Sequence, residues 1–240
     1  MQVDPIAYIR SCYPDRFGIP RQAGLVPMAE AEIVFAATEE NKLALRGLEE
    51  FSHVWVLFWF HQQRYRQWKP LVKPPRLGGK VGVGVYATRS PNRPNPLGMS
   101  VVRLVGLSLR PQEIVLEIRG GDFLDQTPVI DLKPYVAYAD RIEAAQSAWA
   151  TPPAPAMAVQ WRPEALAQLQ RCGRWGYLQA LIEATVGQDP RPAYERGKDG
   201  TPGQQWHMQI ATVEIAWMVE QGQATIVDLH PAPGSEATVE

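Results

Sequence analysis

Hydrophobic and polar residues follow a β-type pattern over the first 140 positions of the chain. β-branched and aromatic residues form short runs or alternate with polar ones, and Gly and Pro separate the runs. Most gaps between runs are too short for a crossover helix, so a doubly wound parallel sheet does not fit. The pattern predicts a mainly β fold, an antiparallel barrel or sandwich. Strands are expected over Val54–Phe60, Lys80–Ala87, Ser100–Leu109 and Glu113–Ile118.

Helical signals lie mostly in the last third of the chain. A short helix is predicted around Thr38–Leu48, with Thr38 as N-cap, and one or two longer helices over Pro163–Val186. The Pro- and Ala-rich segment Thr151–Ala158 is the best candidate for a linker. We expect a β-barrel domain over residues 1–150, a smaller α+β domain over 159–230 and a disordered tail over 231–240. The second domain should end in a pair of strands, His207–Val219 and Ala224–Leu229.

Composition excludes several classes of protein. The 240 residues are 45% hydrophobic, and no run approaches the ~18 apolar residues of a membrane span. The first ten residues lack the pattern of a secretory signal. Two cysteines, Cys12 and Cys172, are too few for a disulfide scaffold or a structural zinc site. We therefore expect a cytoplasmic protein that holds no metal.

The net charge of -1 conceals an uneven distribution. The stretch Phe51–Gln112 contains no Asp or Glu but ten basic residues, which leaves the rest of the chain at a net charge of -11. Such a stripe predicts an anionic ligand on one face; the alternative is a solvated basic face. The interleaved aromatic residues are typical of nucleic-acid sites: Trp55, Trp59, Tyr65, Trp68 and Tyr86. The basic residues are Arg64, Arg66, Lys69, Lys73, Arg76, Lys80, Arg89, Arg93, Arg103 and Arg110.

One glycine motif is rejected as a dinucleotide site. Gly82–Ala87 (GVGVYA) matches G-x-G-x-x-A, but its glycines alternate with valines in an expected strand, and a Pro-rich segment follows instead of a helix. Glycines inside a strand indicate sharp curvature or close approach of a ligand.

The most informative segment is Ala87–Ser100 (ATRSPNRPNPLGMS). Its closely spaced prolines fix a stiff loop that presents Arg89 and Arg93, and pre-organised arginines suit phosphate or carboxylate. A purely structural corner loop is the alternative. His53 and His61 lie eight residues apart, on one face if both belong to a strand. His61 and Gln62 are interpreted as ligand contacts, whereas His53 fits a core histidine equally well.

Two further segments each allow two interpretations. Asp122–Pro128 (DFLDQTP) follows a strand and carries two carboxylates, which could act as acid and base or could form a turn. Asp189–Tyr194 (DPRPAY) lies on a long loop, where prolines again flank an arginine. That loop is either functional or a rigid packing element.

Together the motifs resemble the TsaA-like, TrmO-type tRNA methyltransferases. The resemblance runs from about Ile6 to Leu229, and its A-T-R-S-x-x-R-P-N-P segment is highly specific. The co-linear segments are Arg21–Gly24, Gly47–Glu49, Phe51–His53, Phe60–Gln62, Arg76–Gly79, Ala87–Ser100, Asp122–Pro128 and Asp189–Tyr194.

The resemblance implies an S-adenosylmethionine-dependent enzyme, a homodimer whose β-barrel binds the methyl donor without a Rossmann sheet. Its substrate would be the N6 nitrogen of N6-threonylcarbamoyladenosine at position 37, beside the anticodon of threonine tRNAs. The implied tRNA-binding residues are Arg93, Asp189, Arg191 and Tyr194. The implied donor-binding residues are Arg21, Gln22, Ala23, Gly24, His61, Gln62, Arg89, Met99, Asp122, Phe123, Leu124 and Asp125.

The catalytic residue is not fixed by the sequence. Arg89 or Arg93 is expected to pair with the threonylcarbamoyl carboxylate, and the candidates for a general base are His61, Asp122, Asp125 and Tyr194. Two other functions stay open: an RNA-binding barrel without catalysis, and a methyltransferase acting on a small metabolite. Two residues depart from the family pattern, Asn92 in place of a frequent aromatic and Gln126 in place of a glycine. A turn that needs positive φ would be strained at Gln126.

Overall fold

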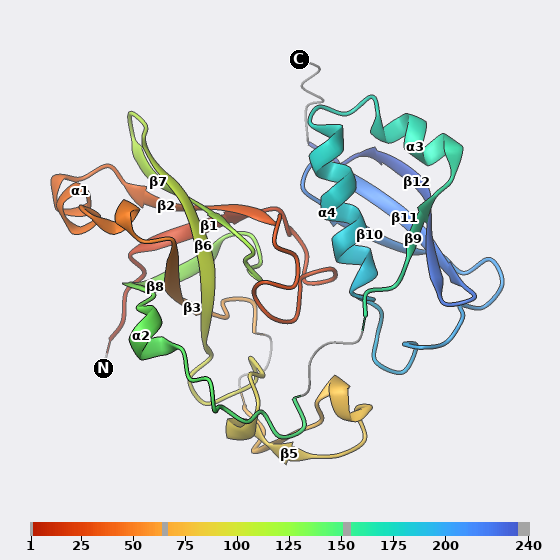
Figure 1. Ribbon diagram of the computed structural model, residues 1–240, viewed down its shortest axis with the longest axis horizontal. Helices are drawn as coiled ribbons and strands as arrows, with labels where there is room; N and C mark the ends of the chain where they lie inside the picture. The colour runs from red at the N-terminus through yellow and green to blue at the C-terminus, as the bar shows by residue number, and fades with distance from the viewer. Residues whose placement is uncertain (1, 64–66, 151–154, 235–240) are drawn as a thin grey trace.

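The computed structural model describes residues 2–63, 67–150 and 155–234 of the chain. Figure 1 shows two bodies side by side, with a small projection below them that contains β5. The first body contains β1 (Ala7–Ser11), β2 (Glu30–Ala36), α1 (Glu39–Ala44), η1 (Leu48–Glu50), β3 (His53–Trp59), β6 (Leu97–Leu109), β7 (Glu113–Arg119), β8 (Thr127–Pro134) and α2 (Ala137–Asp140). The projection contains β4 (Leu71–Val72), η2 (Pro75–Leu77), β5 (Val83–Gly84) and η3 (Val85–Ala87). The second body contains β9 (Val159–Trp161), α3 (Pro163–Leu169), α4 (Trp175–Gly187), β10 (Trp206–Ile210), β11 (Val213–Glu220) and β12 (Gln223–Pro231).

Six strands of the first body close into a barrel. Their order is β1–β2–β7–β6–β3–β8, and every neighbouring pair is antiparallel. Every second side chain of a strand points into the barrel and fills its interior. Along β3, Val54, Val56 and Phe58 are buried, while the residues between them are more exposed. The prediction of a mainly β, antiparallel barrel is confirmed. The rejected glycine motif, Gly82–Ala87, runs through β5 and η3 into the Pro-rich segment, and no α-helix follows it in this described part of the chain.

The strands predicted around β3, β6 and β7 are present, as is the short helix α1, whose Thr38 side chain caps the Asn41 N–H at 3.2 Å. The strand predicted over Lys80–Ala87 is wrong. Only Val83 and Gly84 pair there, with β4, and the chain then turns into η3. Because β4 is two residues long, it offers no partner for a longer strand.

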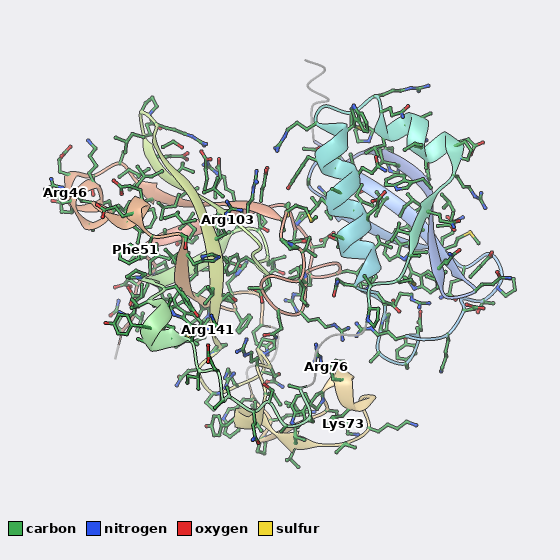
Figure 2. The ribbon with its side chains drawn as sticks, viewed as in Figure 1. Arg46, Phe51, Lys73, Arg76, Arg103 and Arg141 are labelled. Atoms are coloured by element: carbon green, nitrogen blue, oxygen red, sulfur yellow. The ribbon has the colours of Figure 1, made fainter. Side chains whose placement is uncertain are left out.

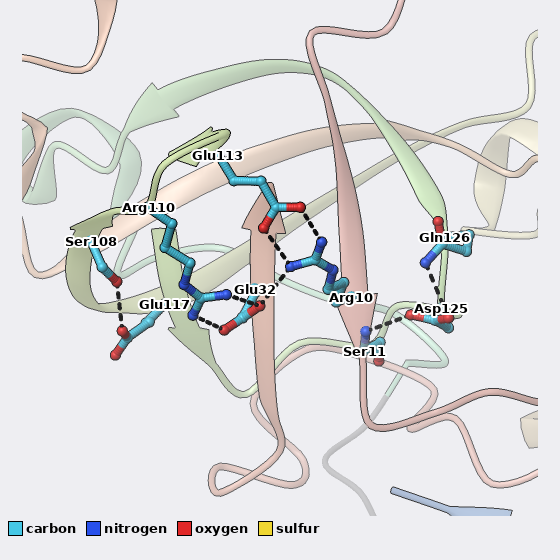
Figure 3. A network of polar contacts seen from close by, with 9 residues as sticks. All are labelled: Arg10, Ser11, Glu32, Ser108, Arg110, Glu113, Glu117, Asp125 and Gln126. Carbon is cyan, nitrogen blue, oxygen red and sulfur yellow. Dashed lines mark hydrogen bonds and ion pairs between the residues drawn. The ribbon is translucent and has the colours of Figure 1, made fainter. Parts of the chain in front are cut away.

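Charged residues cover the outside of the barrel as cross-strand pairs (Figure 3). Arg10 contacts Glu113, with one Nη1–Oε2 distance of 2.9 Å, and lies 3.4 Å from Glu32. Arg110 approaches Glu32 at 2.6 Å. Arg110 is one of the ten basic residues of the acid-free stretch, so part of that charge is neutralised by strand neighbours.

The second body is a four-stranded sheet, β10–β11–β12–β9, that packs against α3 and α4. The helices fall where predicted, and the break between them contains Arg174 at φ 55°. The expected strand His207–Val219 is instead two strands, because the chain turns at Ala211, which has φ 50°. No helix in the described ranges is long and apolar enough to cross a membrane. Residues 151–154 of the predicted linker and 235–240 of the predicted tail lie outside the described residues.

The two hydrophobic cores do not follow the predicted division of the chain. The β1–β2 loop, residues 12–29, belongs to the sequence of the first domain, yet it packs into the core of the second body. Phe17 stacks on Trp217, and the Ala211 N–H donates to the Cys12 carbonyl at 2.7 Å. Both segments therefore contribute to the core of the second body, and the boundary between residues 1–150 and 159–230 stays a prediction.

Candidate active site

A cavity of about 480 Å³ opens beside the barrel, where four loops meet. These are the β1–β2 loop, the turn after β3, the Ala87–Ser100 segment and the β7–β8 loop. The cavity is in the size range of small-molecule sites. Nine of the predicted site residues line it: Arg21, Gln22, His61, Gln62, Arg89, Arg93, Met99, Asp122 and Leu124.

Aromatic packing forms the floor of this cavity. A Cβ atom at Gly98 would clash with the Phe58 ring, so only glycine allows β6 to approach that ring. Phe58 packs edge-on against Phe60 and Phe123, with ring centroids 5.1 and 5.0 Å apart. Phe123, predicted to contact the donor, is buried in the barrel core and supports Phe58 from below.

Arginines dominate the polar wall of the cavity. Arg16, which no sequence motif indicates, lines it with Arg21, Arg89 and Arg93, and Asp122 is the one carboxylate among the described lining residues. Arg89 Nη1 donates to Gln22 Oε1 at 2.5 Å, and Arg93 Nη1 donates to the Thr88 carbonyl at 3.3 Å. These contacts fix the side chains before a ligand arrives, and the surplus of positive charge favours an anion.

Asp122 is directed to the cavity by its neighbours. Ser100 Oγ, also missed from the sequence, donates to Asp122 Oδ1 at 2.7 Å. Burial raises the pKa of Asp122, while the Ser100 hydrogen bond, the charge of Arg89 and a backbone contact with Ala23 oppose that rise. Gly24 in turn donates its N–H to the Gly120 carbonyl at 2.8 Å. Ala23 and Gly24 therefore hold the wall together and do not line the cavity.

Asp125 has a different environment from Asp122. Its Oδ1 accepts the Ser11 backbone N–H at 2.9 Å, and its Oδ2 lies 3.3 Å from Gln126 Nε2 (Figure 3). It is not among the residues that line the cavity. Gln126 has φ 60°, in the left-handed region that favours glycine. The turn therefore does require positive φ at the position where the family pattern has a glycine. Of the two carboxylates, one faces the cavity and the other closes the turn.

His61 lines the cavity and His53 does not. Because β3 ends at Trp59, the two histidines do not share a strand. Burial and the charge of Arg16 lower the pKa of His61, and Asp125 opposes them. His53 instead contacts Ser52 Oγ at 2.9 Å and the Tyr135 ring. Within the described residues no group of three His, Cys, Asp or Glu side chains could hold a metal.

The Asp189–Tyr194 loop lies outside this cavity. Arg191 is 1% exposed, and its guanidinium pairs with Asp189 through contacts of 2.7 and 2.8 Å. It also donates to the Lys198 carbonyl at 3.1 Å and lies over the Trp206 ring. This burial favours a role for Arg191 in shaping the loop, whereas Tyr194 is 71% exposed. The predicted contacts of Asp189, Arg191 and Tyr194 with tRNA stay predictions.

The prediction of one continuous basic face is only partly right. Arg89 and Arg93 line the cavity, but Figure 2 places Arg103 on the barrel, away from Lys73 and Arg76 in the projection below. Arg64, Tyr65 and Arg66 lie outside the described residues. The positive charge at the site comes instead from two parts of the chain, since Arg16 and Arg21 belong to the β1–β2 loop.

The chain is similar to known proteins along its whole length. The family model for the tRNA-methyltransferase O N-terminal domain matches residues 8–141, and that for the TrmO C-terminal domain matches residues 154–232. A tRNA (adenine(37)-N6)-methyltransferase of Escherichia coli (strain K12) is 39% identical over 232 residues, covering 96% of this chain and 98% of the relative. A Pseudomonas aeruginosa relative, 42% identical over 217 residues (90% of this chain, 91% of the relative), carries the name of an S-adenosylmethionine-dependent methyltransferase. The crystal structure of TrmO from Pseudomonas aeruginosa superposes with a TM-score of 0.74 at 34% identity, covering 96% of this chain and 98% of that one. The resemblance seen in the motifs is therefore confirmed, and the chain belongs to the tRNA-methyltransferase O family.

Proposed function

We propose that the chain is an S-adenosylmethionine-dependent tRNA methyltransferase that methylates N6 of the adenine at position 37. The finer proposal is that its substrate is N6-threonylcarbamoyladenosine in threonine tRNAs. The observation that carries the proposal is a cavity in which four arginines face one carboxylate among the described lining residues. Such a wall suits two ligands, a methyl donor and an RNA, that together carry mostly negative charge and one cationic group. The names of the relatives in the family point to the same reaction.

The residues of the cavity fit S-adenosylmethionine. Bound there, the donor would supply a methyl group on a positively charged sulfur. Asp122 would complement its cationic part, an arginine its carboxylate, and the Phe58–Phe60 floor its apolar surface. We assign donor binding to Gln22, His61, Gln62, Met99, Asp122 and Leu124, together with Arg21 and Arg89.

The threonylcarbamoyl group adds a carboxylate to the adenine, and we propose that Arg89 or Arg93 binds it. Both lie on the Pro-rich loop and both are held by neighbours. Arg89 also acts electrostatically on Asp122, so part of its charge is already balanced. Losing the Arg93 side chain should therefore raise KM for the modified tRNA while leaving donor binding unchanged. Losing Arg89 should weaken both.

The N6 nitrogen gives up one proton as it gains the methyl group. His61 and Asp122 line the cavity and could accept that proton, whereas Asp125 and Tyr194 do not line it. The lowered pKa of His61 keeps its ring neutral and able to accept a proton near pH 7. Alignment of the reacting atoms by the walls of the cavity supplies the larger part of the acceleration.

The test is transfer of labelled methyl groups to threonine tRNA with and without the threonylcarbamoyl modification. Labelling of the modified tRNA alone is expected, and equal labelling of both contradicts the finer proposal. Calorimetry with S-adenosylmethionine separates an enzyme from an RNA-binding barrel without catalysis, because only the former should bind the donor. Labelling of small molecules but not tRNA would identify the metabolite alternative. A cytoplasmic homodimer is also proposed, on family resemblance, and sedimentation tests the dimer.

A further inference from the structure

The projection below the two bodies is a separate basic surface. We define the arm as residues 67–87, which hold the β4–β5 pair and the turns η2 and η3. It lies below both bodies in Figure 1, and Figure 2 labels Lys73 and Arg76 on it. The arm has four basic residues and no acidic one: Lys69, Lys73, Arg76 and Lys80.

The lysines of the arm differ from the basic residues of the barrel. Lys69, Lys73 and Lys80 are exposed, and none forms an ion pair with a described residue. Arg10 and Arg110, in contrast, have glutamates across the strand. The charge of the three lysines is thus uncompensated by described side chains, which favours a polyanion as the partner of the arm.

Two aromatic rings lie among these lysines. Trp68 and Tyr86 are 43% and 74% exposed, and their ring centroids are 6.4 Å apart with planes inclined by 32°. Exposed rings beside lysines form a surface on which an unpaired base can stack while its phosphates meet the charges. An acidic peptide would use the lysines alone. The pairing with aromatics therefore favours single-stranded nucleic acid.

A second cavity of about 670 Å³ is lined by Arg76 of the arm, by residues of the β1–β2 loop and by residues of the second body. Its lining includes Arg21, Arg76, Trp149, Asp189, Arg196 and Lys198. Arg21 lines both cavities. Partial burial and the charge of Arg76 lower the pKa of Arg21, against the effect of Asp189, so the two guanidinium groups act on each other. Arg196 Nη2 is buried without a hydrogen-bond partner among the described residues, an arrangement that a bound phosphate oxygen could satisfy.

We propose that the arm binds the single-stranded sugar–phosphate backbone of the RNA substrate and that the second cavity guides that strand to the active site. In this arrangement the lysines contact phosphates and Trp68 with Tyr86 stacks an unpaired base. The proposal rests on the proposed function, since it takes an RNA substrate as given. A second copy of the chain is the competing occupant of the arm.

The test compares two triple variants of the full chain. In the arm variant, Lys69, Lys73 and Lys80 are replaced by Ala. In the control variant, Lys42, Arg46 and Arg103 are replaced by Ala. Figure 2 shows Arg46 and Arg103 on the barrel, away from the arm. Binding of modified threonine tRNA is measured over a range of salt. Loss of the arm lysines should reduce the slope of log K against log salt by about 2, since each phosphate contact contributes roughly 0.7 to 0.9. The control should keep the wild-type slope, and both variants should bind S-adenosylmethionine normally. Trp68→Ala should weaken tRNA binding about tenfold at an unchanged slope.

Equal slopes for the two variants overturn the proposal. If the arm variant keeps the wild-type slope but differs from the wild type in oligomeric mass, the arm is a contact between two copies of the chain, and the proposal is also overturned. The proposed function fails separately. If the wild-type chain binds tRNA through the arm but methylates none, the proposed function is wrong, while the assignment of the arm as an RNA-binding surface stands.

Discussion

Phe17 stacks on Trp217 with ring centroids 5.8 Å apart and planes inclined by 18°. The two rings come from opposite ends of the chain, since Phe17 lies on the β1–β2 loop and Trp217 in the last sheet. The same loop carries Arg16, Arg21 and Gln22 into the cavity of the candidate active site. The second body therefore positions the wall of a site that otherwise belongs to the barrel.

Phe17→Ala should lower the free energy of unfolding by about 2 kcal/mol and weaken donor binding. The substitution removes a stacked ring from a core and loosens the loop that carries Gln22. Urea unfolding and calorimetry with S-adenosylmethionine measure the two effects. Phe51→Ala is the control, because Phe51 is 40% exposed on the far side of the barrel (Figure 2). Similar losses in both variants would contradict the role given to the stack.

Asp122→Asn should abolish methyl transfer yet stabilise the fold at neutral pH. Burial raises the pKa of Asp122 in the folded chain above its usual value of 3.8, so ionisation costs stability as pH rises through the folded pKa. That cost vanishes below 3.8, where both states are protonated. The gain in Tm over wild type should thus be larger at about pH 8 than at about pH 4. A gain that is independent of pH would show that ionisation is not its source. Asn can still accept the Ser100 hydrogen bond, which keeps the geometry comparable.

Arg191→Lys should destabilise the chain by roughly 3 kcal/mol, because a lysine cannot replace a buried two-point contact with Asp189. Chemical denaturation gives the value. Arg110→Lys, in an exposed pair on the barrel, should change little. If the Arg191→Lys variant is fully stable but binds tRNA poorly, Arg191 contacts the RNA directly and the structural role is wrong.

Arg16→Gln should raise the pKa of His61 toward its usual value of 6.5. The positive charge of Arg16 is one of the two causes that lower it, and burial is the larger one, so a partial return is expected. The rate of methyl transfer should then fall at slightly acidic pH, where more of His61 is protonated. Titration of the ring by NMR measures the shift, and Arg46→Gln should leave it unchanged. An unaltered pKa in the Arg16 variant would contradict the electrostatic contact.

The sequence predicted those strands whose residues are apolar or alternate clearly. It did not reveal β2 or β8, whose outward positions carry charges such as Glu32 and Lys133 that pair across strands or with neighbours. β1 is five residues long and was hidden for the same reason, with Arg10 on its outer face. Short strands with charged outer faces resemble loops until their partners are known.

Arg89, Arg93, His61 and Gln62 could be predicted from the residues, because the Pro-rich and His-Gln motifs are local. The resemblance to the family, in contrast, implied Arg21, Gln22, Met99 and Leu124. Arg16 and Ser100 were not predicted: Arg16 belongs to no motif, and Ser100, although it follows Met99, begins an expected strand. Ser100 is an ordinary strand residue until the fold brings its hydroxyl within 2.7 Å of Asp122, and Arg16 is placed by donating to the Gln62 carbonyl in the turn after β3. Arg191 shows the opposite case: its motif looked like a ligand contact, but its burial favours a residue that holds a loop.

The packing of the β1–β2 loop in the core of the second body also determines the order in which the parts of the chain fold during synthesis. The Cys12 carbonyl meets the Ala211 N–H only after residue 211 has left the ribosome. Contacts of such long range form late, and until then the apolar side chains of the loop face water or a chaperone. The barrel can close earlier, but Gln22 and Arg21 reach their places only with the last sheet. A nascent chain therefore acquires its candidate active site only once the last sheet has formed, and a product that is terminated before that sheet should be inactive even when its barrel is complete.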